Sequence, residues 1–162
     1  GSEMCIRDSF LCYLIPVLVC LGIGASAGWL QTEALAEWYP TLVKSPLTPP
    51  ALAFPVAWGI LYICMGISLG VVLARRRAVP GRAALVALWV VQLAANFLWS
   101  LLFFRMRNPA AGLVDIVLLD LLVLAYTVVA WRGCRPSAWL FIPYLLWLLF
   151  ATYLNAFVWA FN

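Results

Sequence analysis

Four stretches of this chain carry no charged side chain and are each long enough to cross a lipid bilayer, and no other feature constrains the fold as strongly. A helix needs about 20 mainly apolar residues to span the hydrocarbon layer. A fifth stretch is equally long but contains two aspartates. The five predicted spans are residues 10–30, 51–74, 83–104, 110–131 and 138–161.

These spans predict an all-α integral membrane protein, a five-transmembrane-helix bundle. Lipid offers the backbone no hydrogen-bond partner, and none of the stretches alternates as a barrel strand does. At 67% hydrophobic and 10% charged residues, the chain has too little polar surface for a soluble globule of this size. Because the connections are short, we expect a single membrane domain over residues 10–162. Residues 1–9 resemble a translated sequencing adapter, and we expect them to be a non-native leader.

The positive charges are distributed unevenly between the two sides of the predicted bundle. The net charge is +4, and the larger group of lysines and arginines follows the second and fourth predicted spans. This group is Arg75, Arg76, Arg77, Arg82, Arg132 and Arg135, against Lys44, Arg105 and Arg107 on the opposite side. The positive-inside rule therefore predicts a cytoplasmic N-terminus. A run of three arginines is too short to indicate a nucleic-acid site, so we expect no nucleic-acid partner.

Several kinds of chemistry lack the residues they need. The chain contains no histidine, and its five cysteines are scattered without a CxxC pair, so we expect no metal site and no obligatory cofactor. No serine–histidine arrangement exists, and we expect no acid–base catalytic residues. Asp115 and Asp120 lie about 140° apart around a helix and do not form a carboxylate pair. Asp120 lies deep in its span, where it must be protonated, paired or in a wet cavity.

Polar and aromatic residues share one face in each of four predicted helices. An amide or carboxylate that faces lipid costs several kcal/mol, so these faces must point inward. Either the bundle is packed solid with hydrogen bonds between helices, or the faces wall a cavity for a large flat ligand with polar edges. The faces are Trp58, Tyr62, Met65 and Leu69; Gln92, Asn96, Trp99 and Phe103; Asp115, Leu119, Leu122 and Tyr126; and Tyr144, Trp147, Ala151 and Asn155.

The predicted loop over residues 31–50 is the one long connection in the chain. Loops of this length are often lids or binding elements, and prolines stiffen this one. Alternatively, Trp38 and Tyr39 anchor the chain at the membrane interface. In the first span, Gly24 and Gly28 form a GxxxG pattern that predicts close helix packing. The pattern leaves open whether the neighbour is a helix of the same chain or of a second subunit.

Four segments together resemble the TspO/MBR family of translocator proteins, also known as peripheral-type benzodiazepine receptors. They are WYPTLVKSPLTPP, FPVAWGILYICMG, QLAANFLWSLLFF and PYLLWLLFATYLN, in this order, and the resemblance runs from Trp38 to Asn162. It implies a five-helix membrane protein, commonly a homodimer, that acts in porphyrin handling, transport or stress signalling. The implied cavity binds porphyrins such as protoporphyrin IX, and in some members sterols, beneath the loop after the first helix.

The resemblance also implies roles for individual residues. Trp58 and Trp147 match pocket tryptophans linked to ligand binding and to light-dependent porphyrin breakdown. Asn96 and Ala151 match cavity positions, and Trp38 and Tyr39 match the loop. With the faces above, the expected ligand-binding residues are Trp38, Tyr39, Trp58, Tyr62, Asn96, Trp99, Phe103, Tyr144, Trp147, Ala151 and Asn155.

Two alternatives remain beside a porphyrin-binding protein. One is an enzyme that degrades porphyrin under light, with Trp58 and Trp147 as photochemical residues; the other is a small proton-coupled transporter that uses Asp120. The chain also departs from the family pattern. Leu47 stands where many relatives have an aromatic residue, and Asp120 lies outside the pattern. The C-terminal segment lacks the tyrosine and basic residue of the vertebrate cholesterol motif, so sterol is not the favoured ligand.

Overall fold

The computed structural model describes residues 6–75 and 78–162, and in this part of the chain it contains five long helices and no strand. Each helix is long and apolar enough to cross a membrane, which confirms the predicted fold class. The helices are α1 (Ile6–Glu37), α2 (Ala53–Ala74), α3 (Arg82–Ser100), α4 (Pro109–Gly133) and α5 (Arg135–Phe161).

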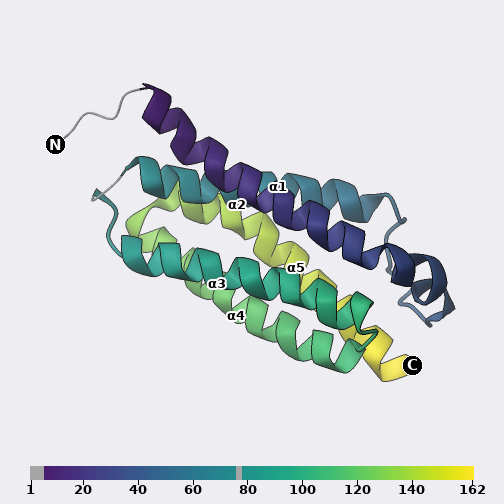
Figure 1. Cartoon of the computed structure of the whole chain (residues 1–162). Helices are drawn as coiled ribbons and strands as arrows, with labels where there is room; N and C mark the ends of the chain where they lie inside the picture. The colour runs from purple at the N-terminus through teal and green to yellow at the C-terminus, as the bar shows by residue number, and fades with distance from the viewer. Residues whose placement is uncertain (1–5, 76–77) are drawn as a thin grey trace.

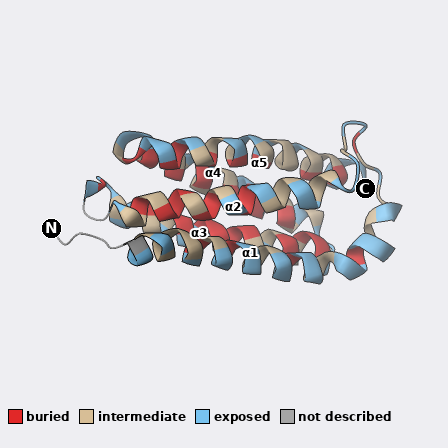
Figure 2. Cartoon of the chain, turned by 90° about the horizontal axis from the view of Figure 1, so that it is seen from above, coloured by how far each residue is buried: buried red, intermediate tan, exposed pale blue. Residues whose placement is uncertain are grey.

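The helices run side by side along one bundle axis (Figure 1). The start of α1, the end of α2 and the α4–α5 connection lie at one end; the loop after α1, the α3–α4 connection and the C-terminus lie at the other. Helix α1 packs along α2, α4 packs along α5, and α2 also packs on α5. Buried residues line the inner helix faces, whereas α1 is mostly exposed (Figure 2).

The first helix is longer than predicted at both ends. Residues 31–37 were expected in the loop, but they continue α1 because Gln, Glu, Ala and Leu are good helix formers. The connection between α1 and α2 is therefore residues 38–52, with a short 3₁₀ turn at Tyr39–Thr41. Residues 6–9 of the expected leader also belong to α1, and residues 1–5 lie outside the described residues.

Helix α3 ends in a π-helical turn, η3 (Leu101–Arg105). This wider turn brings two consecutive aromatic residues, Phe103 and Phe104, into the interior together. The next helix starts at once, because the side chain of Asn108 accepts a hydrogen bond from the Ala111 amide and Pro109 occupies the first turn. The two phenylalanines at this end of α3 contact the loop after α1.

Glycines set the close approach of α1 and α2. A Cβ at Gly24 would lie 2.6 Å from the Tyr62 ring, so its packing partner belongs to the same chain, whereas Gly28 has nothing within 4 Å. The closest approach uses α2 glycines that the sequence analysis missed. A Cβ at Gly66 would meet the Val17 backbone at 2.5 Å, and one at Gly70 would meet Tyr13 at 2.6 Å. The GISLG segment carried the same GxxxG signal.

Candidate ligand-binding site

A chain of hydrogen bonds crosses the bundle interior at Asn96 of α3. The Tyr62 hydroxyl of α2 donates to Asn96 Oδ1 at 2.7 Å, and Asn96 Nδ2 donates to the Tyr144 hydroxyl of α5 at 2.8 Å. The Tyr144 hydroxyl then donates to Gln92 Oε1 at 2.8 Å, and Gln92 Nε2 contacts Met65 Sδ at 3.2 Å. All five side chains are buried, as the polar faces predicted. The network ties α2, α3 and α5 together.

Two indoles lie next to this network, one from α2 and one from α5. The Trp58 and Trp147 rings meet edge to face, with centroids 6.5 Å apart and planes at 89°. The Trp58 ring also contacts the rings of Tyr62 and Tyr144, with centroid distances of 5.6 Å and 6.3 Å. Both indoles are half-buried against the main core cluster, as is Ala151. The indole nitrogen of Trp147 is buried and has no hydrogen-bond partner.

A second group of expected site residues lies toward the loop end. Trp99 donates its indole N–H to Asn155 Oδ1 at 2.9 Å, and Asn155 Nδ2 donates to the Pro109 carbonyl at 2.9 Å. The Trp99 ring stacks on Phe103 with centroids 5.1 Å apart. Asn155 is thus satisfied by α3 and α4. Trp99 packs against the main core cluster and also against a smaller cluster of Ala34, Phe103, Phe104 and Val158. It therefore lies between the two groups of expected site residues.

The loop residues Trp38 and Tyr39 pack on the π turn. Trp38 meets Phe103 edge to face at 5.6 Å, and Tyr39 lies against Phe104 at 5.8 Å. Lys44 extends over the Tyr39 ring, with Nζ 4.7 Å from the ring centroid, and donates to the Tyr39 carbonyl. Burial raises the pKa of the Tyr39 phenol above its ordinary value, so this residue is neutral. Both aromatic residues hold the loop against the bundle.

The rest of the loop is fastened to α5. The side chain of Asn162 pairs with both backbone groups of Val43, each bond 2.9 Å long. The Ser45 and Tyr153 hydroxyls lie 2.8 Å apart. Leu47, the departure from the family pattern, is 66% exposed and contributes little to closure.

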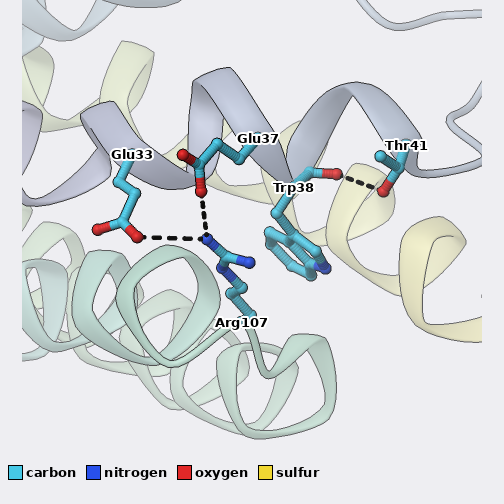
Figure 3. Close-up of polar contacts among 5 residues, drawn as sticks. All are labelled: Glu33, Glu37, Trp38, Thr41 and Arg107. Carbon is cyan, nitrogen blue, oxygen red and sulfur yellow. Dashed lines mark hydrogen bonds and ion pairs between the residues drawn. The ribbon is translucent and has the colours of Figure 1, made fainter.

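An ion-pair cluster lies at the base of the loop (Figure 3). Arg107 extends from the α3–α4 connection to the last turns of α1, where its Nη2 lies 3.7 Å from Glu33 and 3.5 Å from Glu37. The next residue, Trp38, begins the loop, and its carbonyl accepts from the Thr41 hydroxyl. The three charged side chains are 40–65% exposed, so these ion pairs contribute little to stability.

The expected site residues fill the space between them with one another's side chains. Two hollows in the protein surface lie elsewhere: one lies along α1 near Asp8 and Leu73, and the other, of about 500 Å³, lies between Trp29 and Phe97. Neither is lined by an expected site residue. Among the residues described, no three His, Cys, Asp or Glu side chains come together as a metal site would require.

Sequence reasoning also missed residues that complete the site. Phe54 contacts Trp147 with ring centroids 6.0 Å apart, and its position one turn before Trp58 was the available signal. Ser45, Tyr153 and Asn162 fasten the loop, but these contacts join residues more than 100 positions apart. No local pattern in the sequence encodes such pairs.

Comparison with known proteins identifies relatives over nearly the whole chain. The model of the TspO/MBR family matches residues 16–160. The chain is 39% identical to the tryptophan-rich protein TspO of Chlorobaculum tepidum, over 85% of this chain and 87% of that protein. It is 36% identical to protein CrtK of Rhodobacter capsulatus, over 95% and 94%. It is 35% identical to the translocator protein of Homo sapiens, over 88% and 84%.

Proposed function

Because this chain belongs to the TspO/MBR family and is a multi-pass integral membrane protein, we propose that it binds a metal-free porphyrin such as protoporphyrin IX between α2 and α5. The observation that carries the proposal is the pair of indoles at right angles, Trp58 and Trp147. Aromatic faces are the natural partners of a large flat macrocycle, because ring stacking adds to the burial of apolar area.

The polar groups around the indoles suit the polar edge of such a ligand. The unpartnered Trp147 N–H is a buried donor, and leaving a buried donor without an acceptor costs about 1 to 3 kcal/mol. An acceptor on the ligand removes this cost. The ring of Tyr62 contacts Trp58, and Tyr62 with its hydrogen-bond partner Asn96 adds a phenol and an amide beside the indoles. The chain has no histidine to ligate haem iron, so a porphyrin without iron is the better match.

Porphyrin binding is tested by replacing the two indoles together. We expect a Trp58→Phe, Trp147→Phe variant to bind protoporphyrin IX about tenfold more weakly, since two smaller rings offer less stacking area. Porphyrin absorbance during titration of the detergent-solubilised protein measures the dissociation constant without relying on tryptophan emission. The matched control is Trp131→Phe, Trp139→Phe, another edge-to-face pair, formed between the end of α4 and the start of α5, with centroids 5.4 Å apart. Equal affinity in the two double variants overturns the proposal.

A light-dependent enzyme is the second candidate, and the contact between Trp58 and Trp147 favours it. Two oxidisable indoles in contact beside an excited porphyrin are suited to electron transfer. Illumination of the protein with protoporphyrin IX and oxygen decides between binding and turnover. A discrete product that requires Trp58 or Trp147 supports the enzyme, whereas unspecific bleaching in both double variants excludes it.

The transporter alternative depends on Asp120 and on flux across the membrane. Proton-coupled porphyrin flux into liposomes should be lost in Asp120→Asn if this carboxyl carries the coupling proton. Flux that persists in this variant excludes the coupling. The binding titration is independent of this result, since Asp120 lies on α4 and the proposed pocket lies between α2 and α5.

A further inference from the structure

Asp120 lies near the middle of α4, and only one of its two carboxyl oxygens has a hydrogen-bond partner. Its Oδ2 lies 2.6 Å from the Thr152 hydroxyl oxygen of α5, while its Oδ1 is buried without a hydrogen-bond partner. The same hydroxyl oxygen lies 2.8 Å from the carbonyl oxygen of Leu148, one turn earlier in α5. A threonine hydroxyl has a single proton to donate. It cannot fully supply both the carboxyl and the carbonyl.

The surroundings of Asp120 offer a negative charge almost no compensation. No charged residue occurs in residues 83–104 of α3 and η3, 121–131 of α4 or 136–161 of α5. Arginines on the elements packed around it lie only at helix ends, and both ion pairs found among the described residues belong to Arg107. The other titratable groups on these elements are the Asp115 carboxyl and the phenols of α4 and α5. A carboxylate with one neutral donor at membrane depth is costly.

We propose that Asp120 is a proton-binding site in the seam between α4 and α5. The carboxyl holds the proton on Oδ2 and donates it to the Thr152 hydroxyl oxygen, and Thr152 donates its own proton to the Leu148 carbonyl. The 2.6 Å contact lies within the range of a hydrogen bond donated by a carboxylic acid to a hydroxyl oxygen. This assignment also leaves Oδ1 as a neutral carbonyl oxygen, which tolerates burial without a partner far better than a charged oxygen does.

The arrangement connects proton binding to the backbone of α5. When the proton leaves Asp120 for water, Oδ2 becomes an acceptor, and the Thr152 hydroxyl must turn its proton toward it. The Leu148 carbonyl then loses the bond from the threonine side chain. Buried carboxyls of this kind are the groups by which membrane proteins respond to protons. The ligand is a proton, and the inference does not depend on porphyrin binding.

Infrared spectroscopy of the full chain in lipid nanodiscs at neutral pH tests the site. A protonated carboxylic acid has a C=O stretching band well separated from that of a carboxylate. We expect the near-isosteric Asp120→Asn variant to lose one such band that the parent protein shows. We expect Thr152→Val to shift the same band, because the acid proton loses its acceptor, and Thr152→Ser to leave it in place.

Asp115→Asn is the matched control, since it removes the other carboxyl of α4. Any band it loses should be insensitive to Thr152→Val. An Asp120→Asn spectrum identical to that of the parent protein overturns the proposal, because Asp120 is then ionised. A Thr152→Val spectrum in which the band does not shift also overturns the proposal. This second measurement can be made even if Asp120→Asn does not fold.

Discussion

Asn96 forms the link between Tyr62 and Tyr144, and it shows what a single amide does inside a membrane bundle. Its carbonyl accepts from one phenol and its amino group donates to the other. The side chain is 3% exposed, so no water is available to replace either partner. Hydrogen bonds between membrane helices contribute only about 0.6 kcal/mol on average, yet an orphaned buried group costs more than the bond contributes.

At the residue scale, we predict that Asn96→Leu lowers the free energy of unfolding by about 1 to 3 kcal/mol, because it leaves the Tyr62 hydroxyl without an acceptor, whereas Tyr144 still donates to Gln92. Adding Tyr62→Phe to this variant should restore most of the loss, since the unpaired hydroxyl is then gone. Unfolding by SDS titration, followed by circular dichroism, gives both values. A double variant no more stable than Asn96→Leu would show that the amide acts by shape alone.

The elements differ in how they are held. Helices α1 and α2 meet through glycines, whereas the loop over residues 38–52 is held by rings at its start and by hydrogen bonds to α5 farther on. Backbone contact between helices leaves no room for an added atom. Side-chain contacts of a loop yield more easily, so we expect this loop to move before any helix does.

Helix packing gives a paired prediction. Gly66→Ala should destabilise the bundle by about 1 to 3 kcal/mol, because the new methyl group meets the Val17 backbone at 2.5 Å. Gly59→Ala, in the same helix, has open space around it and should stabilise the protein by up to about 1 kcal/mol through helix propensity. The same SDS titration compares them. Equal effects in the two variants would refute the packing argument.

For the loop, we predict that Asn162→Ala increases the hydrogen-exchange rate of the Val43 amide, which donates to the Asn162 side chain. Arg107→Gln should leave this rate unchanged, because the exposed ion pairs lie at the other end of the loop. Exchange followed by mass spectrometry of peptides covering residues 38–52 provides the measurement. Faster exchange in Arg107→Gln alone would mean that the ion pairs, rather than Asn162, fasten the loop.

The whole molecule has two unlike ends. At one end lie the N-terminus and connections that carry Arg75, Arg82, Arg132 and Arg135; Arg76 and Arg77 lie outside the described residues. At the other end, Arg107 faces two glutamates, which reduces the positive charge there. The predicted orientation rests on the arginines gathered at the first end, because the positive-inside rule counts Lys and Arg and gives acidic residues little weight.

Orientation is tested with single cysteines introduced into a variant that lacks the native ones. A cysteine at Thr41, in the loop, should react with a membrane-impermeant thiol reagent applied to intact cells. A cysteine at Ala78, in the α2–α3 connection, should react only after the cells are permeabilised. The reverse pattern would show that the N-terminus faces outward.

The sequence alone determined the five spans and the inward direction of their polar faces. The physical reason is the solvent: a bilayer satisfies no backbone group and penalises every exposed amide, so length, composition and helical period suffice. It also located the family resemblance, which the comparisons confirmed. Local properties of this kind need no knowledge of how helices meet.

Only the tertiary structure decided which groups became partners. Trp99 pairs with Asn155, Asn96 with two phenols and Asp120 with Thr152, and each choice depends on how two helices are rotated and spaced. The π turn that presents Phe103 and Phe104 to the loop depends equally on contacts between distant segments. At the α1–α2 crossing, Gly66 lies against Val17 and Gly70 against Tyr13, and these glycines allow the two helices to approach closely.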